Sequence, residues 1–176
     1  MKTKKEIAIK ILKNEKQIIY LKREFYYLKK LEGKLITINF SLGLSHIPKT
    51  HDFTFKAKKV FFTMELFGPN LNQHKNISSH NKFNYLLQMV SALEQVHSKG
   101  VVHQDIKPSN FVQSLNPVFD TRLFLIDFGL AKTHIDTDGN VVPPNEVKNF
   151  VGTLSYASIN AHKNIVIYHF NRFFSV

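Results

Sequence analysis

The sequence predicts a mixed α+β fold, and three observations support this. Hydrophobic residues alternate with other residues over 6–12, which is the pattern of a strand. Apolar residues recur every three or four positions over 16–31 and 82–99, which is typical of helices that bury one face. Short apolar runs between polar loops then predict further strands, at 101–102, 111–112 and 123–126. The 176 residues, 43% of them hydrophobic, are enough for one domain with a packed core.

The first strand and the first helix each carry a charged side chain in an informative position. In the strand, the isoleucines share one face and Lys10 lies on the opposite face. In the helix, Glu24 falls within the apolar stripe at 100° per residue. A buried charge left without its partner costs about 3–5 kcal/mol, so Glu24 needs a cationic partner. The stripe consists of Ile18, Leu21, Phe25, Leu28 and Leu31.

The middle of the chain continues the mixed pattern. Val60–Leu66 predicts a buried strand, and Gly68-Pro69 is expected to break the chain after it. Gly100 is a plausible stop for the helix over 82–99. Residues 127–156 show no period and predict an extended loop, which at that length is usually functional. The second helix is expected to bury the face formed by Phe83, Leu86, Leu87, Val90, Leu93 and Val96.

Composition excludes several classes of function. The chain has no cysteine, which excludes disulfides, catalytic thiols, zinc–thiolate sites and iron–sulfur clusters. A net charge of +11 is compatible with nucleic acid, acidic membranes, or acidic or phosphorylated proteins. No arginine-rich tract or aromatic RNA-binding motif accompanies that charge, so we expect a solvated basic surface. A nucleic-acid-binding domain remains the weaker alternative.

Targeting and membrane signals are not expected. The longest apolar runs are a few residues, well below the about 18 needed to span a bilayer. Lys10 interrupts the apolar stretch near the N-terminus, and no small-residue cleavage site follows it. We therefore expect a cytoplasmic protein without membrane contact, with the nucleus as the alternative location.

The most informative motif is residues 103–110 (HQDIKPSN), and Asp127-Phe128-Gly129 follows 22 residues after its aspartate, Asp105. Upstream, residues 7–10 (IAIK) lie in the first strand and Glu24 in the first helix, and Gly152-Thr153 comes later. These five segments, in this order, resemble the catalytic segments of protein kinases. The resemblance implies a two-lobe fold that binds ATP in the cleft between a sheet-containing lobe and a helical lobe.

The resemblance also implies a role for each motif residue in transfer of the ATP γ-phosphate. Lys10 would contact the α- and β-phosphates, and Glu24 would hold Lys10 in place. Asp105 would orient the substrate hydroxyl and accept its proton, with Lys107 neutralising the γ-phosphate. Hard oxygen ligands suit Mg²⁺, and the two side chains expected to bind it are Asn110 and Asp127.

Three more residues complete the expected site. Thr153 would support Asp105 and Lys107 by hydrogen bonds. His103 is expected to be a structural residue buried behind the catalytic loop. Gly129 is expected to adopt backbone angles closed to other residues, which would let the turn aim the preceding aspartate.

Other segments resemble the casein kinase 1 group. Residues 65–71 (ELFGPNL) are similar to its hinge, which implies that Glu65 and Phe67 lie at the adenine, with Met64 behind it. Residues 157–160 (ASIN) replace the usual Ala-Pro-Glu motif, as in that group. The resemblance implies a monomeric, ATP- and Mg²⁺-dependent serine/threonine kinase with protein substrates. The segments most similar to the tau-tubulin kinase branch are 105–111, 139–144 and 160–164.

The resemblance divides the chain and also marks where it departs from the pattern. Residues 6–67 correspond to the N-terminal lobe and 68–164 to the C-terminal lobe. The sequence begins at the lysine strand and ends soon after the activation segment, so we expect 1–176 to be a truncated kinase domain. Residues 34–45 resemble an insertion, and 165–176 an unrelated tail.

Two substitutions bear on regulation and specificity. Gln104 replaces the arginine that pairs with an activation-loop phosphate in many kinases. Ser155 replaces an arginine that would bind a substrate anion, which leaves open any preference for phosphorylated or acidic substrates. Truncation leaves an alternative function, a catalytically inactive kinase-like interaction module. It also predicts an exposed apolar surface on the C-terminal part of the chain.

Overall fold

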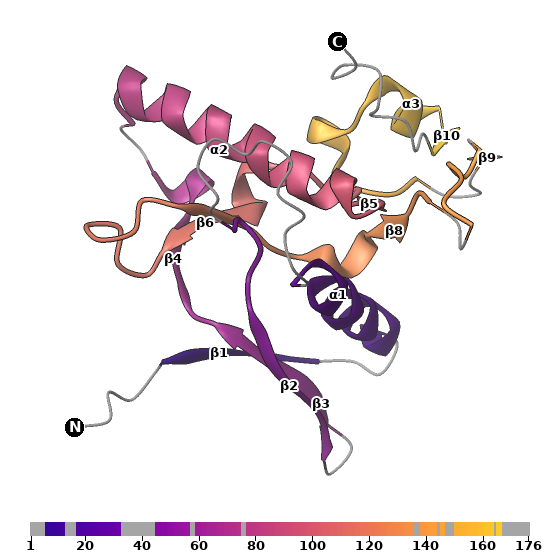
Figure 1. Cartoon of the computed structure of the whole chain (residues 1–176), viewed down its shortest axis with the longest axis horizontal. Coiled ribbons are helices and arrows are strands. Elements are labelled where there is room, and N and C mark those ends of the chain that lie inside the picture. Colours follow the sequence, from indigo (N-terminus) through magenta and orange to yellow (C-terminus); the bar gives the residue numbers. More distant parts are fainter. Residues whose placement is uncertain are drawn as a thin grey trace.

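In the computed structural model, α1 contacts both a three-stranded sheet and the segment that leads into β8 (Figure 1). The structure describes residues 6–12, 17–32, 45–56, 59–74, 77–135, 138–143, 145–146, 150–163 and 165–166. The α-helices are α1 (Ile18–Leu31), α2 (Ser79–Ser98) and α3 (Ile159–His162). The strands are β1 (Ile7–Ile11), β2 (Thr50–Lys56), β3 (Lys59–Glu65), β4 (Phe67–Asn70), β5 (Val101–Val102), β6 (Phe111–Ser114), β7 (Leu123–Leu125), β8 (Lys132–Thr133), β9 (Asn145–Glu146) and β10 (Ile165–Val166). The predicted mixed α+β fold is confirmed.

The first sheet has the strand order β1-β3-β2, and both pairs are antiparallel. Strand β1 confirms the alternation predicted over 6–12. Its isoleucine side chains are 44–55% exposed, whereas Lys10 lies on the opposite face and reaches α1. The strand predicted at Val60–Leu66 is β3, which lies at the centre of the sheet, and its Phe62 is fully buried.

Two strands differ from the sequence-based expectation. Strand β2 was not predicted, and its pairing with β3 has an irregularity between Thr50 and Phe53. The predicted chain break at Gly68-Pro69 is wrong, because both residues lie in β4. A Cβ atom on Gly68 would stand 2.9 Å from the carbonyl oxygen of Ser114, so glycine permits the close pairing with β6. The proline is tolerated because β4 is an edge strand of the β4-β6-β7 sheet.

Helix α1 confirms the helix predicted over 16–31. Glu24 is 2% exposed and lies among the buried apolar residues, as its helical angle predicts. Burial of each leucine of this face contributes about 1.5–3 kcal/mol to folding. The leucines that pack into the core with Phe62 are Leu21, Leu28 and Leu31.

Helix α2 confirms the predicted second helix, but the predicted buried face is correct only at its end, where Val96 is buried and Leu93 packs against the core. Ser78 begins the helix by accepting a hydrogen bond from the backbone N–H of Asn81 at 3.3 Å. The buried side is formed instead by Gln88, Ala92, Gln95 and Val96. Most of the expected face is exposed: Phe83 65%, Leu86 58%, Leu87 56% and Val90 49%.

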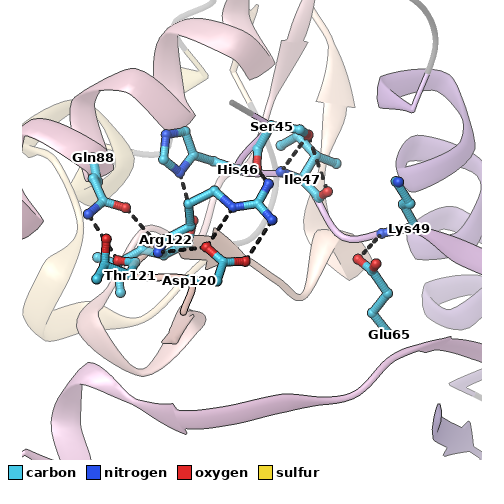
Figure 2. A network of polar contacts seen from close by, with 10 residues as sticks. Ser45, His46, Ile47, Lys49, Glu65, Gln88, Asp120, Thr121 and Arg122 are labelled. Carbon is cyan, nitrogen blue, oxygen red and sulfur yellow. Dashed lines mark hydrogen bonds and ion pairs between the residues drawn. The ribbon is translucent and has the colours of Figure 1, made fainter. Parts of the chain in front are cut away.

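Segment 45–49, between α1 and β2, is bonded to the region around β7 (Figure 2). The Nδ1 atom of His46 lies 2.7 Å from the carbonyl oxygen of Leu123. Arg122 pairs with both carboxylate oxygens of Asp120, at 2.8 and 2.6 Å, and donates to the carbonyl oxygen of the residue before His46. These bonds fix the connection that follows α1 against the part of the fold that contains β7.

The described residues of segment 127–156 are largely irregular, as predicted. It nevertheless contains β8, β9 and 3₁₀ turns at 128–130 and 154–156, and β8 pairs with β5. Apart from Ser45 and the strand β10, the predicted insertion at 34–45 and the predicted tail at 165–176 lie outside the described residues. None of the described helices is long and apolar enough to cross a bilayer.

Candidate active site

The side chains of Lys10, Glu24 and Asp127 meet where β1, α1 and the turn after β7 converge. The Nζ atom of Lys10 lies 2.5 Å from Oε2 of Glu24 and 3.3 Å from Oδ1 of Asp127. Glu24 is thus the buried acid, and Lys10 is the cationic partner that its burial requires. The arrangement presents an ammonium group between two carboxylates, one of which is 47% exposed.

The charge state of this cluster follows from its burial. Burial raises the pKa of Glu24 to about 7, and the attraction of Lys10 only partly opposes this effect. Burial also acts to lower the pKa of Lys10, but the carboxylates of Glu24 and Asp127 together raise it. Lys10 therefore remains a cation at neutral pH and is able to bind a phosphate oxygen.

His103 organises the loop that precedes Asp105. The backbone N–H of Asp105 donates to Nδ1 of His103 at 3.2 Å, so the ring proton lies on Nε2, which donates to the carbonyl oxygen of Ile126 at 2.9 Å. The ring packs edge-on against Phe128, with centroids 4.7 Å apart. Burial lowers the pKa of His103, so the ring stays neutral. The structure places it as a support behind the loop.

Asp105, Lys107 and Thr153 form a closed triangle. Lys107 Nζ lies 2.7 Å from Oδ2 of Asp105 and 2.9 Å from the Thr153 hydroxyl, which donates to Oδ1 of Asp105 at 2.7 Å. The amide nitrogen of Asn110 donates to the main-chain oxygen of Asp105 at 2.8 Å. Burial acts to raise the pKa of Asp105, but hydrogen bonds from Lys107 and Thr153 outweigh it and lower the pKa. Asp105 is therefore ionised at neutral pH and is able to accept a proton.

Ile126 connects the Lys10–Glu24–Asp127 cluster to the Asp105–Lys107–Thr153 triangle. Its N–H donates to the carbonyl oxygen of Asn110 at 2.9 Å, and its carbonyl oxygen accepts from His103. Because Asp127 is the next residue, these bonds fix the lysine cluster relative to the triangle. The structure therefore brings together in one region all of the predicted catalytic and metal-binding residues.

The backbone around the site corrects one expectation. Asp127 itself adopts the left-handed conformation, with φ 68°, and Gly129 does not have a positive φ. The aspartate is thus aimed by its own backbone, a conformation that costs about 1–3 kcal/mol in a residue other than glycine. Gly152 does need to be glycine, because it has φ 107° and a Cβ atom there would lie 2.7 Å from the carbonyl oxygen of Gln104.

The predicted adenine-contacting residues lie at the end of β3 and in β4. Met64 is 8% exposed and pairs across the sheet with Ala8, two residues before Lys10. The carboxylate of Glu65 accepts a hydrogen bond from the backbone N–H of Lys49 at 3.0 Å. The ring of Phe67 packs on Phe124, with centroids 4.6 Å apart. Met64 and Glu65 thus neighbour the lysine strand, whereas Phe67 belongs to the β4-β6-β7 sheet and packs on the β7 residue Phe124.

The donor set fits a magnesium ion. Asn110 directs its amide nitrogen to Asp105, which leaves its amide oxygen as a ligand, and Asp127 presents an exposed carboxylate. Mg²⁺ usually takes one or two protein oxygens and completes its shell with phosphates and water. In the described part of the chain, no group of three or more His, Cys, Asp or Glu residues could hold a metal by itself. The pair therefore suits a metal that arrives with a nucleotide.

Two contacts from α1 to the segment after Asp127 were not predicted from the sequence. Arg23 donates to the carbonyl oxygen of Gly129 at 3.5 Å, and the hydroxyl of Tyr27 lies 3.2 Å from that of Thr133. Their place in the sequence could have indicated these contacts, because Arg23 and Tyr27 lie within one helical turn of Glu24.

Comparison with known proteins agrees with this geometry. Residues 1–161 match the family model of the protein kinase domain. A Dictyostelium discoideum protein called a probable serine/threonine-protein kinase is 36% identical to the chain over 163 residues, which is 89% of this chain and 31% of that protein. The chain therefore spans about a third of the length of that relative. The family match extends over most of the chain and includes every residue of the two clusters, and on this basis the chain belongs to the protein kinase family.

Proposed function

We propose that the protein transfers the γ-phosphate of ATP to serine or threonine hydroxyls of protein substrates. The observation that carries the proposal is the convergence of the Lys10–Glu24–Asp127 cluster with the Asp105–Lys107–Thr153 triangle through Ile126. The Dictyostelium relative carries the name of such a kinase. Phosphoryl transfer requires positioning and charge neutralisation, and these are the two properties that the clusters combine.

Each residue has a definite part in the proposed reaction. Lys10 binds the α- and β-phosphate oxygens, and Glu24 holds it at the correct position. Asp105 orients the substrate hydroxyl and accepts its proton. Asn110 and Asp127 supply oxygen ligands to Mg²⁺, which neutralises charge on the phosphates when it is bound.

Lys107 is proposed to exchange partners during the reaction. Without nucleotide, its ammonium pairs with Asp105 at 2.7 Å. The γ-phosphate is a stronger competing anion, so nucleotide binding draws Lys107 away from that carboxylate. Asp105 then loses a cationic neighbour, which makes it a better proton acceptor at the moment when the substrate hydroxyl needs one.

The finer proposal is a kinase of casein kinase 1 type, closest to the tau-tubulin kinase branch. Its support is the hinge-like stretch 65–71, the ASIN segment at 157–160 and the DIKPSNF segment at 105–111. In the same interpretation Met64 and Glu65 border the adenine, with Phe67 at the adjacent hinge.

Peptide phosphorylation tests the proposal. Peptides that differ only in the acceptor, Ser, Thr, Tyr or Ala, are incubated with Mg·ATP and the protein or its Asp105→Asn variant. We expect transfer to the Ser and Thr peptides, and a rate lower by about 10²–10⁴-fold in the variant. Nucleotide binding without transfer would identify an inactive kinase-like module, and equal transfer to Tyr peptides would contradict the serine/threonine assignment.

A further inference from the structure

We infer that the hydroxyl of Tyr27 is a positioning group for phosphoryl transfer, which holds α1 against the segment that carries Asp127; the inference rests on the proposed function. The Tyr27 hydroxyl lies 3.2 Å from the Thr133 hydroxyl, across 106 positions of sequence. Tyr27 is 8% exposed, and Thr133 is half-buried. A bond shielded from water in this way defines a relative position better than an exposed one.

Tyr27 belongs to one stripe of α1 that faces residues 127–133. In the first turn of α1, Tyr20 lies close to Gly129: its Cβ atom is 3.6 Å from the position that a Cβ atom on Gly129 would occupy. One turn further, Arg23 donates to the carbonyl oxygen of Gly129 at 3.5 Å. Tyr27 makes the third contact of the series, on the far side of the glutamate that pairs with Lys10. Glu24 is therefore held between two contacts to the same segment.

The partner of Tyr27 also leads to the catalytic loop. Thr133 lies in β8 and pairs with Val101 of β5, and the residues leading to Asp105 follow β5 directly. The Tyr27 hydroxyl thus connects the helix that carries Glu24 to the strand pair that supports Asp105. Its bond is to Thr133 rather than to a site residue, so it acts through these elements. Loss of the bond would let α1 shift and lengthen the Lys10 contacts, which are 2.5 and 3.3 Å long.

Matched variants test this inference. Tyr27→Phe and Thr133→Val each remove one hydroxyl and keep the shape of the side chain. Tyr26→Phe is the control, because Tyr26 is the adjacent tyrosine, is 57% exposed and retains its ring contact with Tyr27 in the variant. Thr133→Ser keeps the hydroxyl and is the conservative rescue.

We expect Tyr27→Phe and Thr133→Val each to lower kcat about three- to tenfold, the effect of one hydrogen bond, with KM for the peptide little changed. Tyr26→Phe and Thr133→Ser should stay within about twofold of wild type. The double variant should match either single variant, because both remove the same bond. Assays run well below the unfolding midpoint of every variant exclude a simple loss of folded protein. Wild-type turnover in Tyr27→Phe, or a fully additive double variant, overturns the inference.

A second measurement tests the Tyr27–Thr133 bond without an assay of phosphoryl transfer. Amide hydrogen exchange over residues 127–133 should be faster in Tyr27→Phe than in Tyr26→Phe, since the segment loses one of its attachments to α1. Equal exchange rates would overturn the inference even if the protein is an active kinase. If the wild-type protein transfers no phosphate, the proposed function fails, and the exchange comparison still reports on the Tyr27–Thr133 bond.

Discussion

Both carboxylate oxygens of Asp105 have partners within the protein. Thr153 binds Oδ1 at 2.7 Å, while Lys107 and Asn110 lie 2.7 and 3.3 Å from Oδ2. These partners hold the side chain in one orientation and keep it ionised. The Thr153 hydroxyl contacts both the carboxylate of Asp105 and the ammonium group of Lys107, so it connects the segment after residue 150 to the catalytic loop.

Thr153 offers a direct test of that bridge. Thr153→Ala removes hydrogen bonds to both Asp105 and Lys107, so the carboxylate loses its partner at Oδ1 and is held less firmly. We expect kcat to fall about tenfold or more, with the affinity for nucleotide nearly unchanged. Steady-state kinetics with saturating Mg·ATP measure this. Thr153→Ser retains the hydroxyl and should recover most of the activity; equal rates in the Ala and wild-type proteins would exclude the bridge.

Glu24 makes stability depend on pH in a particular direction. Burial raises its pKa in the folded state to about 7, from an ordinary value of 4.5. The folded state then binds a proton more tightly than the unfolded state does. The contribution of Glu24 to the free energy of unfolding is at most about 3 kcal/mol. It is fully present below pH 4.5 and is lost as pH rises through 7. Denaturant unfolding of wild type and Glu24→Gln across this range should show the difference in free energy of unfolding declining as pH rises; a constant or rising difference contradicts it.

The residue-level site was largely predictable because kinase chemistry requires fixed residue types at fixed spacing. Asp105, Lys107 and Asn110 lie in one short motif, and the helical angle of Glu24 alone indicated a buried acid in need of a cation. The left-handed backbone of Asp127 could not be predicted, because nothing local favours that conformation over one at Gly129. The Tyr27–Thr133 bond was equally hidden, because it joins residues 106 positions apart.

At the scale of the elements, periodicity identified helices but not always their buried side. In α1 the apolar stripe is the buried one. Helix α2 has an apolar face and a face that contains Gln88 and Gln95. The glutamine face is the buried one, because both side chains form hydrogen bonds with backbone groups. Gln88 accepts from the N–H of Leu123 at 2.7 Å and donates to the carbonyl oxygen of Thr121 at 3.2 Å. A pattern of hydrophobicity does not contain that information.

This interpretation of α2 predicts unequal stability costs for substitutions at two adjacent positions. Gln88→Leu adds an apolar side chain to a helix yet leaves two backbone groups near β7 without their partner, at a cost of about 1–3 kcal/mol. Leu87→Gln removes an apolar side chain that is 56% exposed and should change stability by less than about 0.5 kcal/mol. Urea unfolding of both variants measures this. If Leu87→Gln proved the more damaging change, the assignment of the buried face would be wrong.

Viewed as a whole, the described molecule has an apolar surface on the part that follows β4, as the sequence predicted. Four side chains of α2 are 49–65% exposed, and three near α3 are 50–74% exposed. Exposed apolar groups of this size favour self-association, which the net charge of +11 opposes. The residues involved are Phe83, Leu86, Leu87, Val90, Leu154, Tyr156 and Ile159.

The two clusters join α1 and β1 to the loops that follow α2, so a nucleotide bound between them should stabilise the whole fold. Mg·ADP at 100 times its Kd raises the free energy of unfolding by about 2.7 kcal/mol. EDTA should remove most of this gain, because in the proposed function the metal would link the phosphates to the side chains of Asn110 and Asp127.

Thermal unfolding with ADP, in the presence and absence of Mg²⁺, measures the effect. Asp127→Asn should abolish the dependence on the metal, because a neutral amide replaces the charged ligand. Asp52→Asn removes an exposed aspartate of β2 and serves as the matched control that keeps the metal dependence. Since Asp127 also pairs with Lys10 at 3.3 Å, the informative quantity is the metal-dependent shift within each variant rather than its absolute midpoint. A shift of equal size with and without Mg²⁺ in the wild-type protein would mean that Asn110 and Asp127 hold no metal.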